Sequence, residues 1–338
     1  MNIYTPITLI EVGRRAEESE QLLYNWESLD INSLVFPQDK VVCFFGGNST
    51  TRPEQANGNA KVPDSMISAK NRKKTQIFSF SYKTEPYITD TVFNKMYQSE
   101  AELLFEKSFK PLIFDSKGNM KEIQGIEKAF KRLIFNSHCG GSRFVNIIID
   151  KFYDTLIQKF PPATAEMLIN KIQYFSYAPL ENPTHNVNAV IVSPLVDINN
   201  SWNKALDLAV NSKIDIDYPK GIIKRYIKAR SSGKIAEFFK EVFQETRAIM
   251  FKIGNSTYII PGQMNPNMNF GDHSIDCLSK QNILESDTDC AETAKSTRYA
   301  VQLFLNAFTS DAPFDQKGTF TKAARNFDEN PPASQKAF

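Results

Sequence analysis

Short apolar runs alternate with amphipathic stretches along most of the chain, and this pattern predicts an α/β fold. Val41 to Phe45 is a continuous apolar run that ends in Gly46-Gly47-Asn48, which is typical of a buried strand followed by a tight loop. Further strands are predicted over residues 76–82, 133–135, 174–177 and 189–192. Apolar residues at helical spacing predict helices over residues 91–107, 121–131, 145–156 and 167–172. The alternation of the two element types favours a mostly parallel sheet flanked by helices.

The second half of the chain departs from this simple alternation. Residues 201–246 have helical spacing without a strand signal, which predicts a helical insertion. Two apolar stretches, 248–253 and 258–260, flank a Gly-Asn-Ser turn and predict a β-hairpin. After a last strong helix, residues 311–338 are polar and contain prolines. We therefore expect a single domain over residues 1–310 and a polar C-terminal tail.

Composition and charge narrow the class of protein. The 338 residues are 41% hydrophobic with 26 Phe and 12 Tyr, which is typical of an ordered globular chain. The 40 Lys and Arg nearly balance the 38 Asp and Glu, so we expect no nucleic-acid partner. No two cysteines have the spacing of a zinc site or a CxxC pair, which favours free thiols and predicts no metal centre. The four cysteines are Cys43, Cys139, Cys277 and Cys290.

Neither a cleaved leader nor a membrane span is visible in the sequence. The first residues lead into a charged stretch instead of an apolar one, and no uncharged apolar run reaches about 18 residues. We therefore expect the protein to work in solution, either in the cytoplasm or after export by a route without a cleaved N-terminal signal.

The segment Ser137-His138-Cys139-Gly140-Gly141 joins a predicted strand to a predicted long helix. A nucleophile in a sharp strand-to-helix turn needs small residues two positions before and after it. Cys139 has Ser137 and Gly141 there, whereas Ser137 in that role would be flanked by the ring of Phe135. The positive end of the helix dipole would also favour the thiolate form of the cysteine. Cys139 is therefore the candidate nucleophile, and a tight turn around an inert buried cysteine is the alternative.

On these residues the chain resembles the α/β-hydrolase superfamily, in particular its lipase- and esterase-like members, with cysteine in place of the usual serine. The resemblance covers about residues 40–308 and implies the chain order nucleophile, acid, base. It implies Asp197, which follows a predicted strand, as the acid. That residue could equally cap the next helix, and the two roles can coexist. The resemblance implies His273, in a turn-rich loop before the last strong helix, as the base.

The neighbours of these candidates matter for the assignment. His138 would point away from the adjacent cysteine, and His185 precedes the strand of the acid, so neither fits the position of the base. Asp272 is a poor orienting partner for His273 because adjacent side chains diverge. The resemblance further implies an oxyanion hole formed by the backbone of Gly140 and by the loop Gly46-Gly47-Asn48.

The implied activity is hydrolysis or transfer of an ester, thioester or lipid acyl group. The helical block resembles the lids of lipase-like enzymes, which favours a small-molecule or lipid acyl substrate. Its basic residues fit either peripheral contact with an anionic membrane or a solvated helix face. They are Lys220, Lys224, Arg225, Lys228 and Arg230.

Two other functions stay open at this point. One is a catalytically inactive binding protein with the same fold, and the other is a cysteine peptidase of another fold that uses Cys139 and His273 as a dyad. None of these functions requires a cofactor, and the sequence leaves the oligomeric state open.

Overall fold

The computed structural model describes residues 10–14, 36, 40–47, 53–82, 98–197, 199–264, 272–285 and 288–332. The chain divides into two compact units. Unit 1 consists of Met1–Ser65, Ala69–Tyr174 and Pro183–Val187. Unit 2 consists of Met66–Ser68, Phe175–Asn182 and Asn188–Phe338.

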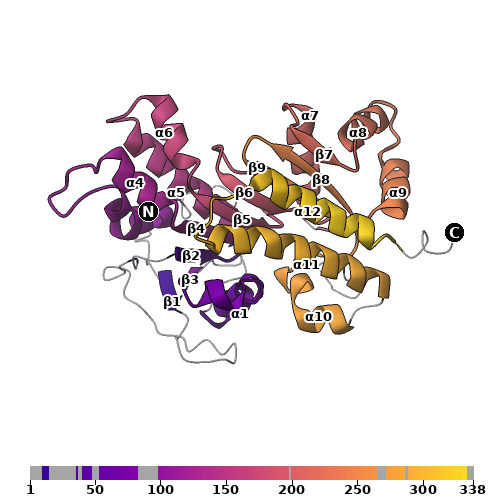
Figure 1. Ribbon diagram of the computed structural model, residues 1–338, viewed down its shortest axis with the longest axis horizontal. Helices are drawn as coiled ribbons and strands as arrows, with labels where there is room; N and C mark the ends of the chain where they lie inside the picture. Colours follow the sequence, from indigo (N-terminus) through magenta and orange to yellow (C-terminus); the bar gives the residue numbers. More distant parts are fainter. Residues whose placement is uncertain are drawn as a thin grey trace, which may run out of the picture. The chain divides into compact units, whose positions relative to one another are not determined.

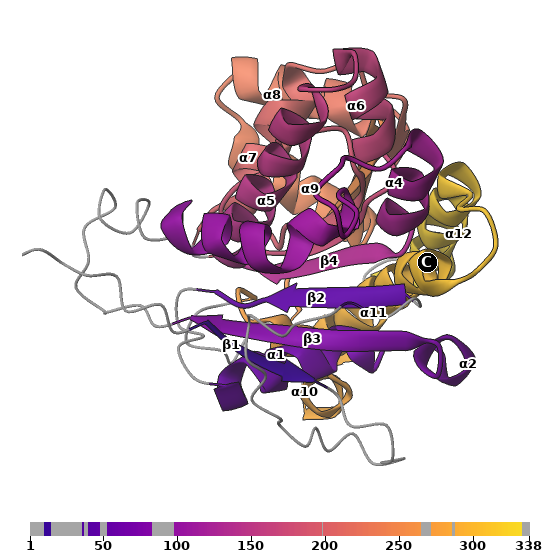
Figure 2. The same ribbon diagram turned by 90° about the vertical axis from the view of Figure 1, so that its left-hand side faces the viewer.

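The sheet of unit 1 contains four strands, which Figure 2 shows in the order β1, β3, β2 and β4. The strands β2 (Lys40–Phe45), β3 (Thr75–Tyr82) and β4 (Leu133–His138) are parallel, and β1 (Ile10–Arg14) pairs antiparallel with β3 at the edge. All six residues of β4 and five of the six in β2 are buried. Such continuously buried strands are typical of parallel strands covered on both faces.

Helices of unit 1 pack against this sheet. Strands β1 to β3 contact α1 (Pro53–Asp64), while β2 and β4 contact α5 (Gly141–Leu156). The sequence pattern predicts no helix where α1 lies, because its buried residues are mostly small or polar. The remaining elements are α2 (Ala69–Arg72), a helical segment at 98–104, η2 (Phe105–Phe109), η3 (Lys110–Leu112), α4 (Ile123–Phe130) and α6 (Pro162–Ile169). Residues 91–97 of the predicted helix 91–107 lie outside the described residues.

Strand β5 (Gln173–Tyr177) ends in unit 2, where β6 (Asn188–Val192) pairs in parallel with β9 (Ser256–Pro261). Strand β9 forms an antiparallel hairpin with β8 (Ala248–Ile253), which confirms the predicted hairpin. On the other side, β8 pairs with β7 (Ile216–Tyr218). This last strand lies inside the block 201–246, for which the sequence predicts helices only. Its three half-buried residues are too few to produce a strand pattern.

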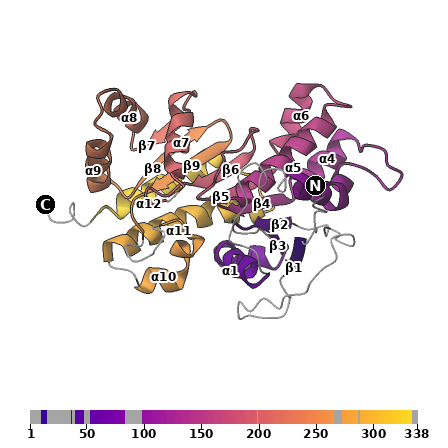
Figure 3. The same ribbon diagram turned by 180° about the vertical axis from the view of Figure 1, so that it is seen from behind.

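Seven helices are described in unit 2. Figure 3 shows α7 (Ser201–Val210), α8 (Ile222–Ser231) and α9 (Ile235–Glu245) beside the hairpin strands. They are followed by η4 (Ile275–Leu278), α10 (Lys280–Glu285), α11 (Thr288–Thr309) and α12 (Gln316–Glu329).

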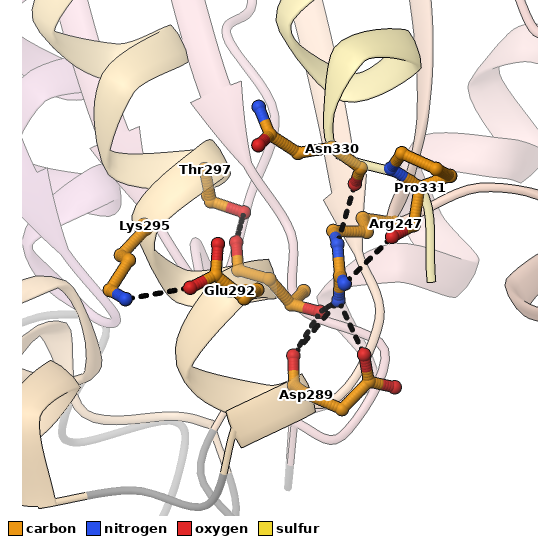
Figure 4. A network of polar contacts seen from close by, with 8 residues as sticks. Arg247, Asp289, Glu292, Lys295, Thr297, Asn330 and Pro331 are labelled. Atoms are coloured by element: carbon orange, nitrogen blue, oxygen red, sulfur yellow. Dashed lines mark hydrogen bonds and ion pairs between the residues drawn. The ribbon is translucent and has the colours of Figure 1, made fainter. Parts of the chain in front are cut away.

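Helix α12 occupies the segment that the sequence predicts to be a polar tail. Figure 1 shows it alongside α11, and it buries Phe320, Ala323 and Phe327, which are spaced three and four residues apart. Figure 4 shows how its end is held: the buried guanidinium of Arg247 donates hydrogen bonds to the carbonyl oxygens of Asn330 and Pro331. Only three residues make up this apolar stripe, which explains why the composition of the segment alone does not reveal the helix.

The fold is therefore α/β: unit 1 has parallel strands with one antiparallel edge strand, unit 2 has a parallel pair extended by antiparallel strands, and helices contact the strands in both. Within the described ranges, no helix is both long and apolar enough to cross a bilayer.

Candidate active site

Cys139 sits in a strained turn between a strand and a helix of unit 1. Strand β4 ends at His138, α5 begins at Gly141, and Cys139 between them has a φ of 51°. A residue with a Cβ in this left-handed region costs about 1–2 kcal/mol relative to the right-handed region. Its carbonyl oxygen accepts hydrogen bonds from the backbone nitrogen and the Oγ of Ser142, at 3.2 and 2.8 Å. These bonds attach the bend at Cys139 to the beginning of α5. Backbone strain of this kind is concentrated at functional sites.

Glycines allow the loop after β2 to approach this turn closely. A Cβ on Gly141 would lie 2.2 Å from the carbonyl oxygen of Phe45 and 2.7 Å from that of Gly46. A Cβ on Gly47 would lie 2.8 Å from the Cβ of Cys139. The structure thus places Gly47 against Cys139 and the carbonyl oxygen of Gly46 against Gly141, and Gly140 between them is the N-cap of α5. Asn48, the third residue predicted for this loop, lies outside the described residues.

Burial distinguishes the cysteines from one another. Cys139 keeps 7% of its surface exposed, whereas Cys43 is fully buried and Cys277 nearly so. Burial raises the pKa of the Cys43 thiol and also that of Cys277, where the nearby carboxylate of Asp272 adds to the effect. Both thiols are therefore held in the neutral, unreactive form. None of the four cysteines takes part in a disulfide bond, and Cys290 is half-buried.

Asp197 and His273 are joined by a hydrogen bond in unit 2. The Nδ1 of His273 lies 2.7 Å from the Oδ1 of Asp197. The side chain of Asp197 is completely buried, and 13% of the His273 side chain is exposed. With Nδ1 bonded to a carboxylate, the neutral imidazole leaves its Nε2 as a proton acceptor, which is the tautomer of a general base.

The carboxylate of Asp197 also accepts hydrogen bonds at the start of α7. Its oxygens accept hydrogen bonds from the backbone nitrogens of Asn199 and Ser201, each at 3.0 Å. Burial alone would raise the pKa of Asp197, but the hydrogen bonds from His273, Ser201 and Asn199 outweigh burial and lower the pKa. The bonds at the start of α7 and the bond to histidine coexist in one ionised carboxylate.

The other two histidines occupy different environments. His138 is buried at the end of β4. His185, in unit 1, lies between two carboxylates, with Nδ1 2.8 Å from Glu166 Oε1 and Nε2 3.3 Å from Asp150 Oδ1. These contacts tie the segment 183–187 to α5 and α6.

Two tyrosines of β5 contact residues of the candidate site that the sequence analysis did not connect with them. The hydroxyl of Tyr174 lies 2.7 Å from Ser137 Oγ, and the hydroxyl of Tyr177 donates to the carbonyl oxygen of Asp272 at 2.6 Å. Both tyrosines are fully buried. A tyrosine in a buried strand needs a hydrogen-bond partner for its hydroxyl, which is the signal that the sequence offered.

The described residues thus contain two groups, each defined within its own unit. Unit 1 brings together Cys139, Gly140 and the glycines after β2, and unit 2 brings together Asp197 and His273. Among the described residues, no cluster of three His, Cys, Asp or Glu side chains could hold a metal ion. No protein-family model matches the chain, and no curated protein is significantly similar to it in sequence.

Proposed function

We propose that the chain is an acyl hydrolase or acyltransferase of the α/β-hydrolase type. In this proposal Cys139 is the nucleophile, His273 the general base and Asp197 the acid that orients the base. The observation that carries the proposal is the left-handed conformation of Cys139 between β4 and α5. Glycine would adopt this left-handed conformation without strain. In a protein without chemistry at this position, a cysteine there would only destabilise the fold.

The proposed reaction has two steps. His273 accepts the thiol proton at Nε2 while the sulfur of Cys139 attacks the carbonyl carbon of an ester or thioester substrate. The protonated imidazole then gives that proton to the departing alcohol or thiol, which leaves a thioester on the cysteine. Water or another acceptor, deprotonated by the same imidazole, cleaves the thioester and regenerates the thiol.

The charges around the base support these steps. The lowered pKa of Asp197 keeps its carboxylate ionised near neutral pH, where it fixes the tautomer of His273 and stabilises the imidazolium. The backbone N–H of Gly140 and the glycine loop after β2 would supply donors for the developing oxyanion. The close approach of Gly47 to Cys139 supports this role for the loop.

The test is turnover of a substrate panel by the wild-type protein and single variants. The panel contains p-nitrophenyl esters of increasing chain length, an acyl thioester, a phospholipid and a peptide. Cys139→Ala and His273→Ala should each lower kcat/KM by about a thousandfold or more. Cys290→Ser, which changes a half-buried cysteine on α11, is the matched control and should retain wild-type turnover.

The same panel separates the competing functions. Turnover of the peptide alone would indicate a cysteine peptidase, and no turnover by the wild-type protein would indicate a binding protein. Equal turnover by the wild-type protein and Cys139→Ala would contradict every version in which this cysteine is catalytic.

A further inference from the structure

The loops that carry the acid and the base are joined one residue before each of them. The backbone N–H of Asp272 donates to the carbonyl oxygen of Val196 at 2.6 Å. Val196 directly precedes Asp197, and Asp272 directly precedes His273. This backbone bond places the two loops in register, so that the side chains of the next residues can meet.

A second bond fixes the peptide group that leads into His273. The hydroxyl of Tyr177 donates at 2.6 Å to the carbonyl oxygen of Asp272, which belongs to the peptide bond between Asp272 and His273. Because this peptide group is planar, holding its oxygen restricts the backbone direction at His273. Tyr177 is fully buried, and burial, together with the nearby Cys277, Asp272 and Asp197, raises its pKa. The hydroxyl therefore remains a proton donor across the physiological range.

Tyr177 is itself held by the sheet. It is the last residue of β5, and the next residue, Ala178, donates its backbone N–H to the carbonyl oxygen of Val192 at 2.8 Å. Val192 is the last residue of β6, the strand that leads into the loop of Asp197. The hydroxyl thus has a fixed position with respect to the strand that carries the acid.

The carboxylate of Asp272 holds the loop from its own side. It is fully buried, and its Oδ2 accepts a hydrogen bond from the backbone nitrogen of Met264 at 2.7 Å. The Sγ of Cys277 lies 3.9 Å from its Oδ1. Through its N–H, its carbonyl and its carboxylate, Asp272 therefore contacts the chain both before and after His273.

We infer that Tyr177 and Asp272 are positioning residues that hold the imidazole of His273 in line with the carboxylate of Asp197. The inference rests on the proposed function of that pair. Neither residue needs to touch the substrate. Asp272 does not orient His273 through its side chain, because that carboxylate bonds Met264. Asp272 acts through its backbone N–H, which bonds Val196, and through its carbonyl oxygen, which bonds Tyr177.

The test combines Tyr177→Phe with a readout that belongs to His273 alone. This variant keeps the buried ring and removes the hydroxyl. Tyr226→Phe is the matched control, because Tyr226 is a buried tyrosine of α8 in the same unit. The proton on His273 Nδ1 is followed by NMR in protein labelled with ¹⁵N at histidine, and unfolding is followed by circular dichroism.

We expect the Nδ1 proton of Tyr177→Phe to exchange with water about tenfold faster than in the control, as the loss of one buried hydrogen bond would allow. We also expect kcat to fall about tenfold with KM unchanged, because small misplacement of a catalytic group slows the chemical step. Exchange equal to that of Tyr226→Phe would overturn the inference.

Two variants of Asp272 and a comparison with acyl turnover complete the test. Asp272→Asn, which retains an acceptor oxygen for Met264, should preserve more of the slow exchange than Asp272→Ala. If the Nδ1 proton of His273 exchanged at the same rate in these two variants, the carboxylate of Asp272 would have no positioning role. This comparison remains informative even if Tyr177→Phe fails to fold. Slow exchange that depends on Tyr177 in a protein without acyl turnover would leave the positioning intact and would instead defeat the proposed function.

Discussion

Replacing Gly47 with alanine tests the geometry of the strained turn. The added Cβ would lie 2.8 Å from the Cβ of Cys139, closer than carbon atoms approach in folded proteins. The bend at Cys139 cannot easily shift to avoid this contact, because Gly141 already lies against the carbonyl oxygen of Phe45. We expect Gly47→Ala to lower the free energy of unfolding by about 1–3 kcal/mol, the usual cost of an extra methyl group in a filled core.

A double-mutant cycle attributes this cost to one contact. In a Cys139→Gly background the opposing Cβ is gone, and the nearest remaining contact is the Nδ1 of His138 at 3.5 Å, an ordinary distance. Gly47→Ala should then cost less than about 0.5 kcal/mol, so the coupling between the two positions should equal most of the single-variant cost. Cys139→Gly should itself be at least as stable as Cys139→Ala, because only alanine retains the strain of about 1–2 kcal/mol.

Urea unfolding followed by circular dichroism measures all four proteins of the cycle and the Cys139→Ala reference. The same cost of Gly47→Ala in both backgrounds would show that the alanine is accommodated elsewhere. That result would refute the close approach of the glycine loop to Cys139.

Two further predictions concern other parts of the chain. Hydrogen bonds with Asp150 and Glu166 raise the pKa of His185, so this contact should stabilise the fold fully below the unfolded pKa of about 6.5 and be lost as the pH rises through the higher folded value. Urea unfolding should therefore show that the stability advantage of the wild type over His185→Gln shrinks as the pH rises above about 6.5, and a constant difference would contradict this. Arg247→Met removes the donor to the carbonyl of Asn330 and should cost about 2–3 kcal/mol. Hydrogen–deuterium exchange should then accelerate in α12, and unchanged protection there would contradict the anchoring role.

The strands could be predicted where burial makes the sequence continuously apolar. The runs that became β2, β4 and β6 stand out because nearly every residue in them is buried. Helix α1 escaped prediction because its buried residues are mostly small or polar, and helix α12 because it buries only three residues. In both cases tertiary packing, which composition does not report, decides the structure.

The candidate site could be predicted only in part. The small residues around Cys139 and the order of acid and base along the chain led to Asp197 and His273, whose side chains lie 2.7 Å apart. The hydrogen bond from Tyr177 to Asp272 joins residues 95 positions apart, and no local sequence pattern predicts such a contact. The close approach of Gly47 to Cys139 likewise depends on how β2 and β4 pair.

The reactivity of Cys139 toward iodoacetamide at about pH 7 tests the central claim most directly, because it reports on the thiol and its base without any knowledge of the substrate. Mass spectrometry measures the alkylation of each cysteine in the wild-type protein and in His273→Ala, with buried Cys43 and Cys277 as unreactive references. We predict that Cys139 reacts faster than half-buried Cys290 in the wild type and about tenfold more slowly once the imidazole is removed. Equal rates for Cys139 in the two proteins would contradict the account.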